Sequence, residues 1–99
     1  MVSLQKLEIE LQELFKQKQY SKIIFEITSQ TEDEERSSFL CNLLGLSRIS
    51  NDNKNKDTLS MALRDFKQGY LKEKNTNHAI DCLANFITSS VLLMDLEKD

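Results

Sequence analysis

Near the middle of the chain, residues 39–46 read Phe-Leu-Cys-Asn-Leu-Leu-Gly-Leu. The large apolar side chains here do not fall on one stripe of a helix, because Leu43, Leu44 and Leu46 follow one another almost without a break. A helix that is apolar on more than one side has to be covered on more than one side. We therefore predict a helix over about residues 33–49 that packs against neighbours on two faces.

Four further segments carry apolar residues at steps of three and four, the spacing of one helix face. They span about residues 3–17, 20–29, 57–71 and 78–96. Ser3 and Asp57 are the expected N-caps of the first and fourth helices. The segment at 20–29 is short and rich in β-branched residues, so a strand is the alternative there, although its spacing favours a helix. Residues 50–56 are polar and rich in Asn, which predicts a loop.

The composition also favours helices. The 99 residues include no Pro and only two Gly, whereas an all-β domain needs both for its tight turns. A chain of this length fits one domain, and short connections favour antiparallel packing of neighbouring helices. We predict a single all-α domain of about five helices over residues 1–99.

Charge and hydropathy limit the classes of partner. The net charge is −3 with both signs interspersed, which argues against a nucleic-acid partner, for which a basic stripe is expected. Uninterrupted apolar runs reach four residues at most, far fewer than a membrane span needs, so we expect no membrane association. The first residues contain no apolar leader, and we expect a cytoplasmic location.

The residues that could carry chemistry are scattered. Cys41 and Cys82 stand far apart within apolar stretches and are expected to be buried small hydrophobes. His78 is the only histidine, no Gly-rich segment could cradle a phosphate, and zinc needs clustered Cys and His. The charged run at residues 32–36 is expected to be a solvated helix start. We expect no catalytic residue, no cofactor and no metal site.

An internal repeat is present at the level of helices. The pairs Leu44-Gly45 and Leu83-Ala84 occupy the middle of the third and fifth segments, 39 residues apart. The loop at 50–56 is about five residues longer than a tight turn needs, which leaves a period of about 34 residues. The predicted units are a repeat over about 4–37, a repeat over about 38–76 with a loop insertion at 50–56, and a half repeat over 77–97.

This period, with a small residue in the middle of a helix, resembles the tetratricopeptide repeat. Gly45 and Ala84 match the small residue, and Tyr20 matches the aromatic at the hairpin turn. The second helix of the family's hairpin has its own pattern of small and large residues, which is matched by Ala62, Phe66 and Gly69. The family's Trp is replaced, and the Pro that closes each repeat is missing. The resemblance implies antiparallel helical hairpins stacked as a short α-solenoid.

The resemblance also implies a function. In the family, the first helix of each hairpin lines a concave groove, so this chain would be a non-catalytic protein-interaction scaffold that binds a peptide or helix. The matching positions are Glu8, Gln12, Phe15, Lys16, Phe39, Asn42, Leu46, Ile49, His78, Asp81, Asn85 and Thr88. The amides of Asn42 and Asn85 could each bond a peptide backbone as donor and acceptor. Phe39, Leu46 and Ile49 could instead belong to the core.

The C-terminal segment is apolar around much of its circumference. We expect its first half, with Ala79, Ile80, Leu83, Phe86 and Ile87, to face the fourth helix. Leu92 and Leu96 would then be left for a partner or for a second copy of the chain. Two alternatives to the interaction module remain: a self-associating helical protein, and an N-terminal accessory segment of a larger bacterial sulfotransferase- or glycosyltransferase-like enzyme.

Overall fold

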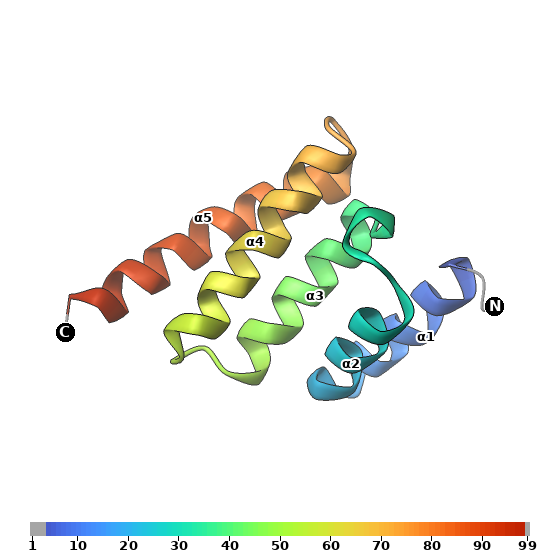
Figure 1. The fold of residues 1–99 in the computed structure, drawn as a ribbon, viewed down its shortest axis with the longest axis horizontal. Coiled ribbons are helices and arrows are strands. Elements are labelled where there is room, and N and C mark those ends of the chain that lie inside the picture. Colours follow the sequence, from blue (N-terminus) through green and yellow to red (C-terminus); the bar gives the residue numbers. More distant parts are fainter. Residues whose placement is uncertain (1–3, 99) are drawn as a thin grey trace.

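The computed structural model describes residues 4–98, which form five α-helices and one 3-10 helix (Figure 1). The helices are α1 (Leu4–Lys16), α2 (Tyr20–Gln30), α3 (Ser38–Asn51), α4 (Lys56–Lys72) and α5 (Asn77–Glu97), with the 3-10 helix η1 at Asp33–Glu35. Residues 4–98 contain no strand, so the all-α prediction is confirmed and the strand alternative at 20–29 is excluded. The expected N-cap Ser3 lies outside the described residues.

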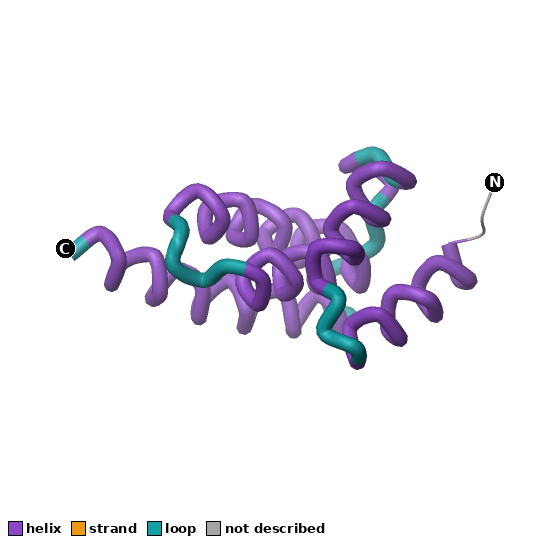
Figure 2. The backbone as a smooth tube through the Cα atoms, turned by 90° about the horizontal axis from the view of Figure 1, so that it is seen from below, coloured by secondary structure: helices purple, strands orange, loops and turns teal. Residues whose placement is uncertain are grey.

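The helix α3 is the centre of the arrangement. It contacts α2 on one side, and α4 and α5 on the other. Figure 1 shows α3, α4 and α5 side by side, with the pair α1 and α2 at the other end of the molecule. Figure 2, turned by a right angle, shows that α1 and the end of α5 lie at opposite ends. The two-sided apolar pattern of residues 39–46 arises because α3 is covered from both directions.

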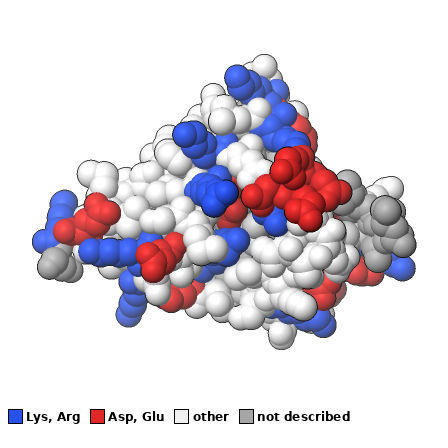
Figure 3. All heavy atoms as spheres, in the orientation of Figure 1, with Lys and Arg blue, Asp and Glu red and all other residues white. Residues whose placement is uncertain are grey.

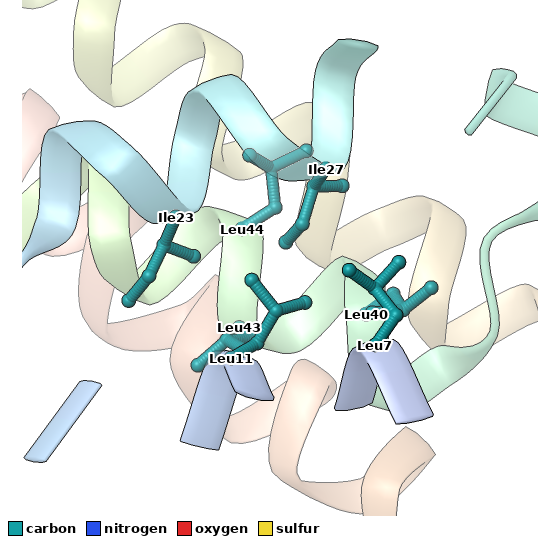
Figure 4. Packing of buried hydrophobic residues seen from close by; sticks show 7 residues of the cluster. All are labelled: Leu7, Leu11, Ile23, Ile27, Leu40, Leu43 and Leu44. Carbon is teal, nitrogen blue, oxygen red and sulfur yellow. The ribbon is translucent and has the colours of Figure 1, made fainter. Parts of the chain in front are cut away.

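Two apolar clusters form on these two sides of α3. The first joins α1, α2 and α3 (Figure 4). Its buried members are Leu7, Leu11, Ile23, Ile27, Leu40, Leu43 and Leu44. The second joins α4 and α5 through Ala62, Phe66 and Cys82, with Leu46 and Ile49 of α3 packed against it. Leu43 and Leu46 thus serve different clusters, as the prediction of two covered faces requires.

Small residues let α3, α4 and α5 approach one another closely. A Cβ built on Gly45 would lie 2.5 Å from Cε1 of Phe66, and one on Gly69 would lie 2.5 Å from Sγ of Cys82 and 2.8 Å from Cβ of Cys41. Both cysteines are buried. Gly45 thus lies at a contact between two helices, and the prediction that both cysteines are buried is confirmed.

The start of the central helix was predicted wrongly. Residues 33–35 form η1, and α3 begins at Ser38, where the Ser37 hydroxyl accepts the N–H of Leu40 at 3.2 Å. Arg36, expected on a solvated helix start, is buried and donates to the hydroxyl and the carbonyl of Thr31. The backbone of Arg36 is extended, and α3 begins after it with Ser37 as its N-cap.

The loop after α3 is shorter than predicted. The helix continues through Asn51 and α4 begins at Lys56, which leaves four residues, 52–55, between them. The N-cap of α4 is Asn55, whose side chain accepts the N–H groups of Asp57 and Thr58, and Asp57 lies in the first turn. The Asn-rich composition concealed a helix end and a cap, so the loop spans 52–55 rather than 50–56.

The orientation of α5 differs from the prediction in part: Ala79 is buried and Phe86 packs against the second cluster, as expected. The face packed into the fold carries the small residues Ala79, Cys82 and Ser89. Ile80 and Ile87, expected to face α4, are both more than half exposed. At Gly69, α4 lies so close to Cys41 of α3 and Cys82 of α5 that only a small side chain of α5 fits at this contact.

Candidate protein-binding groove

Helices α1, α3 and α5 together line a hollow of about 340 Å³. Its walls are Gln12, Phe15 and Lys16 from α1, Phe39, Asn42, Leu43 and Leu46 from α3, and His78 and Asp81 from α5. We call this hollow the groove. Of the residues predicted to bind a partner, Gln12, Phe15, Asn42, Leu46 and Asp81 are brought together here. The groove also contains Lys16, Phe39 and His78, which the resemblance placed at groove positions.

The apolar part of the groove is built from half-buried side chains. Phe15 and Phe39 pack against the first cluster, and Leu46 packs against the second. Two edge-to-face ring contacts fix the aromatic residues. Phe15 meets Tyr20 with ring centroids 5.5 Å apart, and Phe39 meets His78 at 5.3 Å. Phe15, Phe39 and Leu46 therefore pack against the core and also line the groove.

A side-chain hydrogen bond crosses from α5 to α3 beside the groove. The amide nitrogen of Asn85 donates to the side-chain oxygen of Asn42 at 2.7 Å. These are the two amides expected to bond a peptide backbone. The contact occupies the Asn42 oxygen and one Asn85 hydrogen, so Asn42 enters the groove as a donor. The pair also fixes α5 against α3 and so sets the width of the groove.

Opposite charges stand on opposite walls. Lys16 extends from α1 and Asp81 from α5, and both side chains are exposed. A ligand with an anionic end and a cationic end would bind in one direction, with its anionic end at Lys16 and its cationic end at Asp81. The reversed ligand would place like charges together. The arrangement offers polar, apolar and charged contacts within one concave surface.

The remaining predicted residues lie elsewhere. Glu8 accepts a hydrogen bond from the Ser37 hydroxyl at 3.4 Å and thus helps to tie α1 to the start of α3. Ile49 packs against the second cluster. The Thr88 hydroxyl donates to the carbonyl of Ala84 in its own helix. Leu92 and Leu96 are half-buried near the end of α5. None of these residues lines the groove.

One lining residue was missed by the sequence analysis. Leu43 is almost fully buried in the first cluster and also forms part of the groove floor. The signal for it was present, since Leu43 lies four residues after Phe39 and one after Asn42, within the same face of α3.

Two further hollows of comparable volume lie outside the groove. One of about 360 Å³, between α1 and α2, is lined by Glu10, Glu13 and Glu26 beside Leu7, Leu11, Leu14 and Lys22. The other, of about 270 Å³, lies between α4 and α5 and is almost wholly apolar. Its lining residues are Lys67, Tyr70, Leu71, Leu83 and Phe86. Neither joins three helices as the groove does.

The buried ionisable groups Arg48, Asp65, Cys41 and Cys82 lie at contacts between helices. Arg48 of α3 donates from Nε to a carboxylate oxygen of Asp65 in α4 at 2.7 Å, and both side chains are largely buried. Burial raises the pKa of Asp65, while the charge of Arg48 opposes that rise. Burial also raises the thiol pKa of Cys41 to about 11 and that of Cys82 to about 12, so both stay protonated at neutral pH. Thiols in this state are poor nucleophiles and poor metal ligands.

Charged residues are mixed on the face that Figure 3 displays. Acidic residues of η1 lie beside basic ones. Asp33 contacts Arg36 at 2.6 Å and Arg64 at 3.8 Å, and Lys72 donates to the carbonyl of Glu34. Between residues 4 and 98, no three His, Cys, Asp or Glu side chains gather closely enough to hold a metal ion.

Helix α5 is also long and apolar enough to be compared with a membrane span. By length and composition alone it could cross a membrane, since it has 21 residues and an 18-residue window within it has a mean hydropathy of 1.5. The expectation of no membrane association rested on uninterrupted apolar runs, which the Asp, Asn, Thr and Ser residues of α5 keep short. In the structure this helix packs along α3 and α4, with Asn85 bonded to Asn42.

Comparisons of the chain with protein-family models, with curated protein sequences and with solved structures gave no match. The resemblance to tetratricopeptide repeats therefore stays a prediction that rests on the residues alone.

Proposed function

We propose that this chain is a non-catalytic protein-interaction module that binds a peptide or a helix of a partner in the groove between α1, α3 and α5. The observation that carries the proposal is the groove itself. Gln12, Phe15, Asn42, Leu46 and Asp81 come from three helices separated by up to 70 positions, and they line one hollow. A concave surface of mixed polar and apolar residues on rigid helices is the usual form of a binding site.

The order of helix contacts supports a short solenoid of the tetratricopeptide type as the scaffold. The hairpins α1–α2 and α3–α4 pack in sequence through α2 and α3, and α5 packs on both helices of the second hairpin. In such a stack every second helix faces the same side, which accounts for a groove built from α1, α3 and α5.

The groove favours a ligand of defined chemistry. One apolar side chain of the ligand would enter between Phe15, Phe39 and Leu46. A ligand carbonyl would accept from the amide of Asn42, and ligand charges of opposite sign would pair with Lys16 and Asp81. The apolar contact supplies most of the affinity, and the charged pair sets direction and association rate.

The test uses peptides selected from a random displayed library on the intact chain. Their affinities are then measured for the wild-type chain, for Asp81→Lys and for Glu13→Lys. Both altered residues are exposed, and Glu13 lies on α1 outside the groove. We expect Asp81→Lys to weaken binding about tenfold or more, with Glu13→Lys close to wild type. Failure to select any peptide, or equal affinities for all three proteins, would contradict the proposal.

A further inference from the structure

The outer face of α5 carries an exposed apolar stripe. Its members are Ile80, Leu83, Ile87, Val91 and Met94, with exposed fractions from 38% for Leu83 to 59% for Met94. The steps between them are three, four, four and three residues, so the stripe runs straight along the helix axis for about four turns. None of the five is charged, and the side of α5 packed into the fold carries Ala79, Cys82 and Ser89 instead.

The spacing of the stripe residues is the same in both directions from its centre. Ile87 is its centre, Leu83 and Val91 lie four residues to either side, and Ile80 and Met94 lie seven to either side. In an antiparallel pairing about a twofold axis, residue i of one copy meets residue j of the other and the reverse, so this spacing sets each apolar residue of the stripe opposite another. We propose that two copies of the chain associate through this stripe, with their α5 helices antiparallel and Ile87 on the twofold axis.

This register pairs large apolar residues along the whole contact. Ile80 of each copy meets Met94 of the other, Leu83 meets Val91, and Ile87 meets Ile87. The antiparallel direction also sets the two helix dipoles head to tail. Because the spacing is equal on the two sides of Ile87, a second copy matches the stripe residue for residue, and we take a second copy as its occupant.

The size of the stripe sets the strength of the dimer. Five apolar side chains, each about half exposed, offer roughly 300 Å² of apolar surface, near the largest patch that monomers usually expose. The apolar hollow between α4 and α5 adjoins the stripe, since Leu83 belongs to both, and it adds the half-exposed Leu71. The total lies below the roughly 800 Å² per partner of a standard interface. We therefore expect a reversible dimer that forms in the micromolar range and above.

Such a dimer would leave the groove open. Asn85, beside the groove, and Ile87, at the centre of the stripe, lie about 160° apart around α5 at 3.6 residues per turn. Self-association and groove binding therefore use different surfaces and are independent of each other. A dimer would present two grooves and could hold a bivalent partner more tightly than either groove alone.

The first test uses the residue on the axis. Ile87→Asp would place two carboxylates against each other, as Ile87→Lys would place two ammonium groups. We expect the wild-type chain to show a monomer–dimer equilibrium in sedimentation, each variant to weaken it about tenfold or more, and a mixture of the two variants to form heterodimers. Ile9→Asp is the control, because Ile9 on α1 is 63% exposed and lies outside the stripe.

The second test fixes the register by disulfide cross-linking. Ile87→Cys should form a disulfide with itself across the axis, and Ile9→Cys should not. Ile80→Cys and Met94→Cys should cross-link with each other when mixed and poorly when alone. Cys41 and Cys82 are buried and contribute little background. The wild-type chain, without the added cysteine, measures that background.

Three results would contradict the proposed dimer. Efficient self-cross-linking of Ile80→Cys would overturn the antiparallel register. A wild-type chain that remains monomeric from the micromolar to the millimolar range would overturn the proposal. So would a monomer that binds phosphatidylcholine vesicles through α5, since the stripe would then be a membrane surface. Groove binding is measured separately and is unaffected by any of these results.

Discussion

Gly45 on α3 faces the ring of Phe66 on α4 so closely that a methyl group at position 45 would stand 2.5 Å from a ring carbon. Phe66 is fully buried and anchors the second apolar cluster. The contact therefore decides how close α3 and α4 come. It also supports the groove, because the side of α3 that carries Leu46 packs against the same cluster.

Gly45→Leu should destabilise the chain by overpacking this contact. We expect a loss of roughly 1–3 kcal/mol in the free energy of unfolding, measured by urea denaturation. Ser50→Leu, at an exposed position of the same helix, should change stability by about 0.5 kcal/mol or less. Combining Gly45→Leu with Phe66→Ala should cost less than the sum of the two single changes, since the leucine can occupy the vacated space. Simple additivity would show that the two sites do not touch.

Asn55→Ala should remove the N-cap of α4. The side chain of Asn55 accepts two backbone N–H groups that have no other partner in the first turn. We expect a loss of about 1 kcal/mol in unfolding free energy. Asn53→Ala, two residues earlier in the exposed loop, is the matched control and should have little effect. Deletion of residues 51–55 should be more harmful than either change, because it removes the cap and shortens α3. A deletion variant as stable as the wild type would contradict this assignment.

Arg48→Met should leave the Asp65 carboxyl buried without its partner. Breaking a buried ion pair in this way costs about 3 kcal/mol. Because Arg48 lowers the pKa of Asp65 against the effect of burial, its loss should raise that pKa further, which NMR titration of the carboxyl carbon can follow. Arg64→Met is the control, since Arg64 is 80% exposed and 3.8 Å from Asp33. It should cost about 0.5 kcal/mol or less.

The same carboxyl predicts a dependence on pH. Since the pKa of Asp65 in the folded chain lies above its ordinary value of 3.8, the folded state keeps the proton to a higher pH than the unfolded state. The stability contributed by Asp65 is therefore present below pH 3.8 and is lost as the pH rises through the folded-state pKa. The stability deficit of Arg48→Met should be larger at neutral pH than in acid. An equal deficit at both would contradict this account, because it would mean that the charge of Asp65 does not change between them.

The sequence predicted the helices because apolar spacing is a local signal. It could not predict the start of α3, because the bonds of Arg36 to Thr31 depend on a buried contact between neighbouring segments. It missed the face of α5 for a related reason. Leucine and isoleucine surround that helix, so periodicity selects no side, and the packed side is marked by the small residues Ala79, Cys82 and Ser89.

Several residues of the groove were predicted from the resemblance, which implies that the first helix of each hairpin faces the same side. Apolar spacing within one helix cannot predict this arrangement. Phe15, Asn42 and Asp81 were placed together on that basis, and the structure brings them to one hollow. The bond between Asn42 and Asn85 was not foreseen, because it depends on the distance between α3 and α5 rather than on either sequence segment.

Amide NMR spectra of the chain, titrated with a peptide selected on it, test the central claim most directly. We predict that binding shifts the amide signals of Phe15, Asn42, Leu46 and Asp81, and leaves those of Phe25 on α2 and Met61 on α4 unchanged. Shifts confined to α2 and α4, or to the stripe on α5, would contradict the assignment of the groove as the binding site.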